Sequence, residues 1–388
     1  MKKSSLFLLL LLVFACKKEE KQPMQPFVSI PKKIDAFPVN FHKNNPKEIA
    51  KLKQEIKQFY QSKINIDNFS GQFLVAKNGK ILFEDVQGFS NYEQKQKLTK
   101  NTPLHLASIS KVLTAAVVLR FVDEGKLKLD DSFKNYFPEF PYEKVTICTL
   151  LNHRSGLPNY LHVTDDAKIW KKNKMLTNEA LLNLLQTKNL PLEFKTNTKF
   201  SYNNTNYALL ALVIEKISGL SFPEAMQKLL FEPLQMKNSF VFEYEKQKDT
   251  VSHSYKSTWE KIPYDNLDAV YGDKNIYSTV EDLLKFDNAT YSKDFFSDSL
   301  RNEIFKGYSY EKPGVKNYGL GIRLNEWDNY TTLFYHNGWW HGNTTSYTTL
   351  KNDTVAIFCL SNKYTRKVYQ AKALSSLFGN YPFEIEDD

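Results

Sequence analysis

Residues 104–119, LHLASISKVLTAAVVL, place a serine and a lysine at the start of an apolar run. Ser108 and Lys111 are three residues apart, so a helix that begins near Ser108 puts both side chains on one face. The start of that helix also directs free N–H groups and the positive end of the helix dipole towards the group that Ser108 attacks. We therefore predict a nucleophilic serine with a lysine amine beside it.

A serine hydroxyl is a poor nucleophile until a neighbouring base accepts its proton. Lys111 can be this base only in its uncharged form, which burial or a nearby positive charge favours. The mostly apolar residues 112–118 predict that burial. The S-x-x-K pattern also occurs at Ser29 and Ser309, but prolines at both places argue against a helix there. Only the Ser108 copy has the context that the chemistry needs.

The front of the chain has the pattern of an export signal. Residues 1–15 hold two lysines and then ten apolar residues, too few to cross a bilayer of about 30 Å. We therefore predict a secretory signal peptide over residues 1–15. The junction VFAC resembles the lipobox of bacterial lipoproteins, which predicts acylation of Cys16. The alternative is a plain cleaved signal followed by an incidental cysteine.

A tether is expected to follow the signal. Residues 16–46 are rich in proline and show little periodicity, which indicates an extended, lipid-anchored segment. We therefore expect an exported protein that is attached to a bacterial membrane through its lipid, on the periplasmic side or at the cell surface. The catalytic region is predicted to occupy residues 47–388.

The composition is that of a globular protein. A chain of 388 residues with 42% hydrophobic content can bury a large core. The lysines behind the net charge of +9 are scattered, which favours a solvated surface over a nucleic-acid groove. None of the seven histidines lies in an H-x-H or H-E-x-x-H pattern, so we predict no metal and no cofactor. Cys148 and Cys359 have apolar neighbours, which favours buried thiols, and a disulfide between them is the open alternative.

The order of elements predicts an α+β fold. Apolar periodicity predicts helices over residues 49–59, 108–123, 176–185, 206–217 and 368–378. Two further helix starts carry capping boxes, Ser221 with Glu224 and Ser278 with Glu281. Runs rich in β-branched and aromatic residues predict strands over residues 72–76, 81–86, 318–324, 331–335, 344–350 and 354–360. Asn78-Gly79 predicts a hairpin between the first two strands.

Strands at both ends, with helices between them, predict one antiparallel sheet built from the N- and C-terminal segments and flanked by helices. A helical domain would be inserted into it. We expect the α/β part at about residues 47–105 and 271–388 and the helical part at about residues 106–270. The active site would then lie at the seam between the two parts.

A second polar constellation lies in FSYNNTN, just before the apolar run of residues 206–217. A phenol at Tyr202 can relay a proton to or from Lys111, and the amide of Asn204 can bond both Lys111 and a substrate carbonyl. The alternative is that both side chains only pack within a polar turn. Because Tyr-x-Asn recurs at Tyr264 and Tyr335, position rather than spacing favours Tyr202.

The third constellation is YHNGWWHG, in a predicted strand. His336 can donate and accept hydrogen bonds, and Gly338 lets another backbone approach closely, so we predict both as substrate-binding residues. The amide of Trp339 can pair with that of Ser108 as an oxyanion hole. The alternative for His336 is a structural histidine in the sheet.

The three motifs occur in the order seen in a known family. Together they resemble those of the penicillin-recognising serine hydrolases, which comprise class C β-lactamases, D,D-peptidases, D-aminopeptidases and esterases. The similarity is continuous from about residue 71 to residue 362 and includes LLNHRSGLPNY, TKFSYNNTNYALLALVIEKISG, FEPLQMKNS, STVEDLLKF and YGLGIRL. This resemblance implies a β-lactamase/transpeptidase-like fold.

The resemblance also implies a mechanism without a metal. Ser108 would form an acyl-enzyme, Lys111 and Tyr202 would share the role of base, and Asn204 would orient Lys111 and the substrate. The amides of Ser108 and Trp339 would hold the oxyanion, and water would release the acyl group. We therefore predict a hydrolase for peptides that end in D-amino acids, cell-wall peptides among them, or for small esters or amides.

One departure and two alternatives qualify this prediction. Class C β-lactamases usually have Lys-Thr-Gly where this chain has His336-Asn337-Gly338, and a mostly neutral histidine disfavours efficient β-lactam hydrolysis. A penicillin-binding sensor or scaffold of the same fold, with slow or no turnover, is the main alternative function. An α/β-hydrolase is excluded because the chain has no G-x-S-x-G elbow.

Overall fold

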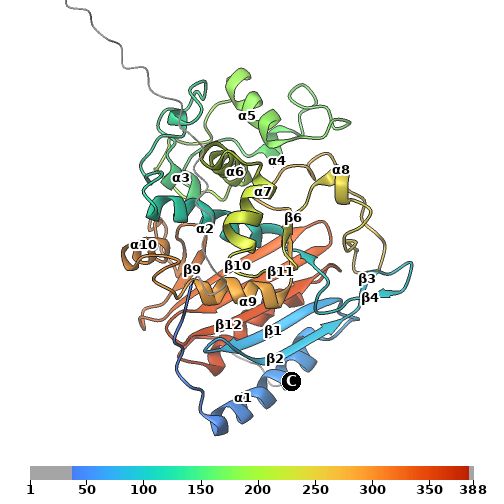
Figure 1. The fold of residues 1–388 in the computed structure, drawn as a ribbon. Helices are drawn as coiled ribbons and strands as arrows, with labels where there is room; N and C mark the ends of the chain where they lie inside the picture. The colour runs from blue at the N-terminus through green and yellow to red at the C-terminus, as the bar shows by residue number, and fades with distance from the viewer. Residues whose placement is uncertain (1–36, 384–388) are drawn as a thin grey trace, which may run out of the picture.

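The computed structural model describes residues 37–383, so the predicted signal peptide, Cys16 and most of the tether lie outside the described residues. A seven-stranded antiparallel sheet crosses the lower half of the molecule in the order β2-β1-β12-β11-β10-β9-β8 (Figure 1). Its strands are β1 (Gly71–Lys77), β2 (Lys80–Gln87), β8 (Lys316–Tyr318), β9 (Arg323–Glu326), β10 (Thr332–Trp340), β11 (Asn343–Leu350) and β12 (Val355–Ser361). Because β1 pairs with β12 along its whole length, both ends of the chain build one sheet, as predicted.

The β1–β2 hairpin turns at Asn78-Gly79, as the sequence predicts. Asn78 has a φ of 52° and Gly79 a φ of 69°, the left-handed pair that a two-residue type I′ turn requires. A side chain at position 79 would also meet the ring of Phe41 at 2.8 Å. The turn therefore helps to set the register of β1, which lies between β2 and β12.

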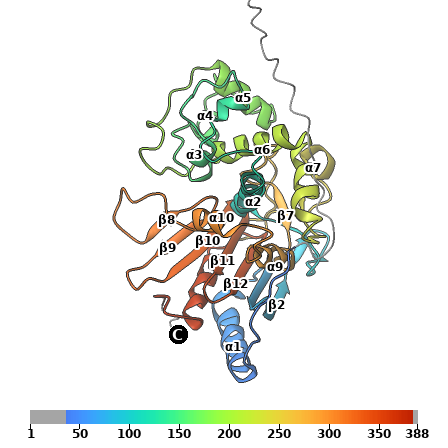
Figure 2. The same cartoon turned by 60° about the vertical axis from the view of Figure 1, so that its left-hand side comes forward.

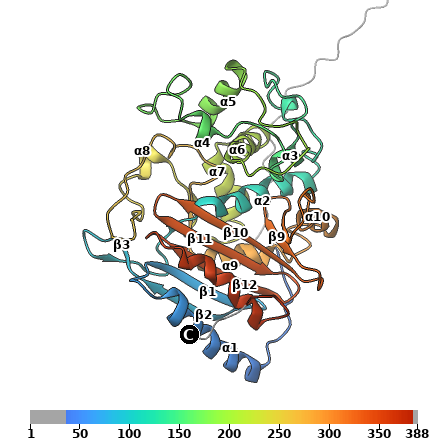
Figure 3. The same cartoon turned by 180° about the vertical axis from the view of Figure 1, so that it is seen from behind.

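Helices cover both faces of this sheet. On one face, α1 (Pro46–Phe59) and the 3₁₀-helix η5 (Lys367–Leu377) bury an apolar cluster that includes Ile56, Ile357 and Leu374 (Figure 3). On the other face lie α9 (Val280–Ala289) and α2 (Ser110–Asp123), with the helical part of the chain above them (Figure 2).

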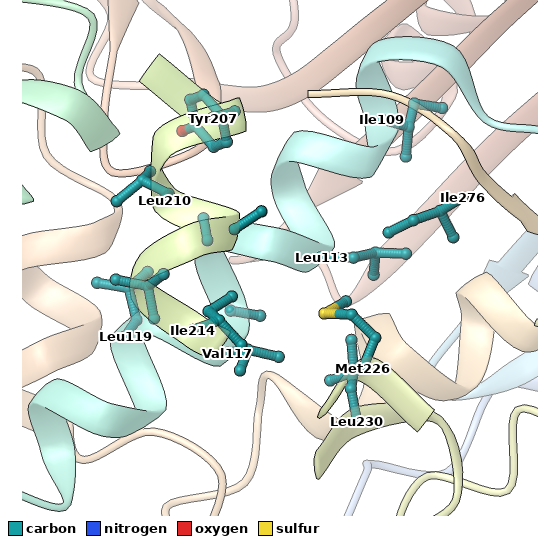
Figure 4. Packing of buried hydrophobic residues seen from close by; sticks show 14 of the residues in the cluster. Ile109, Leu113, Val117, Leu119, Tyr207, Leu210, Ile214, Met226, Leu230 and Ile276 are labelled. Atoms are coloured by element: carbon teal, nitrogen blue, oxygen red, sulfur yellow. The ribbon is translucent and has the colours of Figure 1, made fainter. Parts of the chain in front are cut away.

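The helical part is organised around α6 (Asn204–Ser218), whose middle is completely buried. Val117 of α2 lies beside Ile214 of α6, in a cluster that also includes Leu113 and Leu210 (Figure 4). Gly219 ends α6 with a φ of 70°, a left-handed C-cap that glycine adopts without steric cost. The other helices of this part are α3 (Ile147–Leu151), α4 (Tyr160–Val163), α5 (Asn178–Thr187) and α7 (Phe222–Met226).

A small sheet joins the two parts in the order β5-β7-β6. It consists of β5 (Leu104–His105), β7 (Ile276–Ser278) and β6 (Phe240–Val241). The amide of Leu106 continues this pairing by donating to the Ile276 carbonyl at 2.8 Å. The chain just before Ser108 is thereby fixed by a segment more than 160 residues further on.

Shorter elements complete the described structure. They are β3 (Phe89–Asn91), β4 (Gln96–Lys97), α8 (Tyr244–Gln247), α10 (Asp298–Ile304), the 3₁₀ turns η2 (Ala107–Ile109) and η3 (Phe133–Asn135), and the π-helical turns η1 (Tyr60–Ile64) and η4 (Gln227–Phe231). Within residues 37–383, no helix combines the length and the apolar character that a membrane crossing needs.

Two predicted boundaries near the site differ from the structure. The α-helix after the nucleophile begins at Ser110 rather than at Ser108, because residues 107–109 form a 3₁₀ turn in which the Ile109 amide donates to the Leu106 carbonyl. The predicted strand over residues 318–324 is two strands, β8 and β9. A tight turn separates them, since Gly321 has a φ of 91° and the Gly319 amide donates to the Ile322 carbonyl.

Two predicted helix details are also wrong. Ser278 does not cap a helix with Glu281, because it belongs to β7 and its hydroxyl bonds to that of Ser239 at 2.7 Å. Thr279 caps α9 instead, accepting from the amide of Asp282. The last helix is 3₁₀ rather than α along its whole length. The capping box of Ser221 and Glu224 is confirmed.

Candidate active site

A cavity of about 450 Å³ opens between the edge of the sheet and the helical part. It is lined by Ser108, Leu161, Tyr202, Asn204, Asp265, Asp273, Lys274, Arg323, Asn337, Trp339, Trp340 and His341. Four of the predicted site residues are in this lining. A second hollow, of about 510 Å³, lies between the β3–β4 hairpin and residues 240–261 and holds none of them.

Ser108 lies in the 3₁₀ turn η2, directly before α2. Lys111, in the first turn of α2, is completely buried, and its Nζ atom lies 3.3 Å from Ser108 Oγ. The same nitrogen donates to Asn204 Oδ1 at 2.7 Å and to the Asp273 carbonyl at 2.8 Å. The amine is therefore held between one hydroxyl and two acceptor oxygens, away from bulk water.

Tyr202 and Asn204 come together with this pair because they flank the start of α6. Asn203 caps the helix by accepting from the amide of Thr205, so Asn204 occupies its first turn and faces Lys111. The centre of the Tyr202 ring lies 5.0 Å from Lys111 Nζ. Among residues 37–383, the buried hydroxyl oxygen of Tyr202 has no hydrogen-bond partner.

Strand β10 passes directly beside η2, the turn that carries Ser108 and is called the nucleophile turn below. A Cβ atom at Gly338 would lie 2.7 Å from the Leu106 carbonyl oxygen and 2.9 Å from the Cβ of Ala107, so only glycine permits this approach. Thr345 of β11 adds a hydrogen bond from its hydroxyl to the same Leu106 carbonyl at 2.8 Å. Trp339 follows on β10 and lines the cavity, with 64% of its side chain exposed.

His336 lies beneath the cavity rather than on its wall, which differs from its predicted place. It is completely buried, and its Nδ1 lies 3.0 Å from the Asn337 carbonyl, which can only accept. Its Nε2 then accepts from the Tyr318 hydroxyl at 3.2 Å. Burial, assisted by the nearby Arg323 charge, lowers the pKa of His336 well below its usual value. Both nitrogens of this neutral ring are thus already used inside the protein.

Arg323 is a cavity residue that the sequence motifs did not indicate. It lies on β9 with its guanidinium carbon 4.6 Å from the centre of the Tyr202 ring. Among the described residues no carboxylate pairs with Arg323, whereas Arg120, Arg154 and Arg301 each pair with one. The only sequence signal was its place in YGLGIRL, where a single arginine has no distinctive spacing.

Asp273 and Lys274 were also missed, because they come from a loop without a motif. Lys274 donates to the Tyr160 hydroxyl at 2.7 Å and lies 3.7 Å from Asp273 Oδ1. The Tyr160 hydroxyl in turn donates to Asp273 Oδ2 at 2.8 Å. Burial lowers the pKa of Lys274 despite its acidic neighbours. This buried cluster fixes the backbone of Asp273, whose carbonyl holds Lys111.

At the far end of the cavity, Asp265, Asp268 and His341 place possible ligand atoms within 4.8 Å of one another. The Asp268 carboxylate already accepts from Trp340 Nε1 at 2.7 Å and from His341 Nε2 at 3.0 Å. It also accepts from the amide of Asp265. These bonds occupy the oxygens that a cation would need, so the cluster fits a role in holding the β10–β11 turn.

Comparison with known proteins agrees with this geometry. The Beta-lactamase family model matches residues 64–376. Penicillin-binding protein 4* of Bacillus subtilis (strain 168) is 29% identical over 338 residues, which cover 82% of this chain and 74% of that protein. Teichoic acid D-alanine hydrolase of Staphylococcus aureus (strain NCTC 8325 / PS 47) is 26% identical over 272 residues. The match covers 69% of this chain and 65% of that protein, which is just under two thirds of its length.

Solved structures agree as well. A penicillin binding protein from Bacillus halodurans superposes with a TM-score of 0.70 at 23% identity, covering 87% of this chain and 100% of that one. The octameric penicillin-binding protein homologue from Pyrococcus abyssi gives 0.69 at 26% identity, over 83% of this chain and 77% of that one. The chain therefore belongs to the β-lactamase family, has its mixed helix and antiparallel-sheet fold, and is a serine hydrolase.

Proposed function

We propose that the protein hydrolyses esters or amides of D-amino acids through an acyl-enzyme on Ser108. The observation that carries this proposal is the environment of Lys111. An uncharged amine has two hydrogens and one lone pair. The oxygens of Asn204 and Asp273 take the two hydrogens, which leaves the lone pair for the hydroxyl proton of Ser108.

In the acylation step, Ser108 Oγ attacks the substrate carbonyl while its proton passes to Lys111. The carbonyl oxygen becomes negative and is held by the amides of Ser108 and Trp339, since Gly338, the residue before Trp339, abuts the turn that carries Ser108. Collapse of this intermediate breaks the bond to the leaving group, which receives the proton. Tyr202 is suited to relay it, since its hydroxyl has no other partner among the described residues.

In the deacylation step, a water molecule attacks the Ser108 ester. Lys111 and Tyr202 accept its proton and return one to Ser108 Oγ, so the products are the free acid and the original serine. The same groups therefore act as base and acid in turn. No step in this sequence requires a metal ion.

The charges of the cavity favour an anionic group on the substrate. Arg323 is a permanent cation without a carboxylate partner among the described residues, beside the ring of Tyr202. A carboxylate at the end of a D-amino-acid peptide, or a phosphate near a D-alanyl ester, would supply that partner. The name of the Staphylococcus aureus relative, a teichoic acid D-alanine hydrolase, supports the second of these.

Activity-based labelling tests the nucleophile. Wild type should react with a fluorophosphonate probe and with a fluorescent penicillin, and mass spectrometry should place both adducts on Ser108. Ser108→Ala should take up neither probe, whereas Ser309→Ala, which changes the serine of another S-x-x-K pattern outside the cavity, should still react. Equal labelling of wild type and Ser108→Ala would refute the proposal. Labelling without product release from any ester or peptide would favour the sensor or scaffold.

We also propose that Cys16 carries a lipid that anchors the exported protein. The motif at residues 13–16 supports this proposal. Cells supplied with a palmitate analogue should label the wild-type protein but not Cys16→Ser. Cys148→Ser is the matched control and should label normally. Absence of label on the wild-type protein would leave only the plain cleaved signal, and labelling of Cys16→Ser would place the lipid on another residue.

A further inference from the structure

The residue before the proposed nucleophile has an unusual backbone conformation. Ala107 has a φ of 49°, in the left-handed region that residues with a side chain seldom adopt. On either side, the backbone is tied down: the Leu106 amide donates to the Ile276 carbonyl at 2.8 Å, and the Ile276 amide donates to Ser110 Oγ at 3.1 Å. The Ala107 amide donates instead to a side chain, Nδ1 of His105, at 2.9 Å.

Only one tautomer of the His105 ring fits its hydrogen bonds. Because Nδ1 accepts from Ala107, the ring hydrogen is on Nε2, which donates to Asn275 Oδ1 at 2.9 Å. The amide nitrogen of Asn275 then donates to the Asp268 and Val270 carbonyls at 2.7 and 2.9 Å. His105 is only 3% exposed, so no water competes for these bonds.

His105 also stays in the form that accepts this bond. Burial lowers its pKa to about 4, although Asn275 and Asp268 act in the opposite direction. The other charged or titratable groups that influence it are His341 and Lys274, which both favour the neutral ring. The edge of its ring meets Tyr277, with the ring centres 5.0 Å apart.

We propose that His105 is a positioning residue that holds Ala107 in the left-handed conformation and so directs the amide and the hydroxyl of Ser108 into the cavity. This inference rests on the proposed role of Ser108. The peptide between Ala107 and Ser108 carries the N–H group proposed for the oxyanion hole. If Ala107 changed to a negative φ, that N–H group would rotate away from its place beside Gly338.

Acylation kinetics with a neutral ester test this inference. We would measure the release of nitrophenolate from p-nitrophenyl acetate and the rate of fluorophosphonate labelling for wild type and the variants. His105→Phe keeps an aromatic ring but loses the acceptor, so acylation should slow by about 100-fold, the effect of a small misplacement of a reacting group. His105→Gln offers an acceptor oxygen and should stay within about tenfold of wild type.

The decisive variant is the double substitution. Ala107→Gly removes the steric cost of a positive φ. The double variant, His105→Phe with Ala107→Gly, should therefore be acylated at least about tenfold faster than His105→Phe alone. Tyr277→Phe removes only the hydroxyl of the ring that packs against His105, leaves Nδ1 untouched, and should react like wild type. If His105→Phe reacts like wild type, or if Ala107→Gly gives no recovery, His105 does not act by holding the turn.

Two controls separate this inference from the proposed function. Inactive Ser108→Ala with unimpaired His105→Phe would overturn the positioning role alone, whereas fully active Ser108→Ala would overturn both. Should His105→Phe not fold, Asn275→Gly removes the group that fixes the ring while permitting the φ of 70° found at that position. It should slow acylation by about tenfold, and a wild-type rate would overturn the inference.

Discussion

Lys111 is the residue on which the proposed chemistry depends most. Lys111→Met keeps the length of the side chain but removes the amine, so Ser108 loses its base. Acylation by p-nitrophenyl acetate should fall by about 1,000-fold, within the usual range for a general base. Lys274→Met is the matched control, because it removes the other buried lysine of the cavity, which does not contact Ser108. A smaller effect at Lys111 than at Lys274 would contradict the assignment.

Arg323 is expected to discriminate between substrates rather than to drive the reaction. Arg323→Gln should raise KM for D-alanyl substrates that carry a carboxylate or phosphate by about 10- to 100-fold, the loss of one hydrogen bond to a charged group. Turnover of a neutral ester should change little, and Arg366→Gln, at an exposed arginine outside the cavity, should affect neither substrate. An equal loss with neutral and anionic esters would show that Arg323 supports Tyr202 instead.

His336 shows how burial changes a prediction made from sequence. If its neutral state alone disfavoured β-lactams, His336→Lys should raise cephalosporin turnover relative to ester turnover. In the folded protein, a lysine there would place a charge in a buried site near Arg323 and Lys111 and remove the acceptor of Tyr318.

We therefore expect His336→Lys to lower the free energy of unfolding in urea by about 3 kcal/mol or more. His162→Lys, at an exposed histidine, should cost almost nothing. Unchanged stability of His336→Lys would mean that the site is more open than its burial indicates.

At the scale of elements, the turn between β8 and β9 fixes the strand that carries Arg323. A Cβ atom at Gly321 would lie 2.3 Å from the Cβ of Ala115, and its φ is 91°. Gly321→Ala should therefore lower the free energy of unfolding by about 2 to 4 kcal/mol, the sum of backbone strain and overpacking. Gly125→Ala separates the two effects, because that glycine has a φ of 69° but nothing within 4 Å. Equal losses at both sites would show that the contact with Ala115 is harmless.

The elements that sequence predicted well are those whose pattern is local. Helix α6 carries its own apolar run and its C-capping Gly219, and the β1–β2 hairpin carries Asn78-Gly79. The nucleophile turn could not be predicted in the same way, because its shape depends on pairing with β7, which is far away in sequence. The break between β8 and β9 was missed because the four residues of the turn, 319–322, leave the alternating pattern almost intact.

The candidate site shows the same division. Ser108, Lys111, Tyr202 and Asn204 could be named from spacing and context, and the structure brings them together. Arg323, Asp273 and Lys274 could not, because each is a single charged residue whose role appears only when distant segments of the chain come together around the cavity. His336 was named, but no sequence pattern tells whether a strand residue faces a cavity or lies beneath it.

At the scale of the whole molecule, buried neutral histidines make stability depend on pH. Burial lowers the pKa of His105 to about 4 and those of His153 and His336 well below 6.5. The unfolded chain binds these protons more readily, so stability is complete above about pH 6.5 and falls as the pH drops towards 4. Burial raises the pKa values of Glu84 and Glu215, so these two carboxyl groups increase stability as the pH falls.

Urea unfolding at pH 7.5 and at pH 5 should measure the effect. His105 alone should contribute about 2 kcal/mol of the stability lost between these two values, given its pKa of about 4. His105→Gln should therefore lose less stability over this interval than wild type does. An identical loss in both proteins would mean that His105 is protonated as easily in the folded state as in the unfolded one.

The pairing of β1 with β12 has a consequence for biogenesis. The central strands are contributed by the first and last quarters of the described chain, and the strand beside the nucleophile turn is among the late ones. A ribosome or a translocation pore delivers the chain from its N-terminus, so the hydrolytic centre stays unassembled until almost the last residue has emerged. Acylation of Ser108 therefore has to wait until the C-terminal strands have joined the sheet.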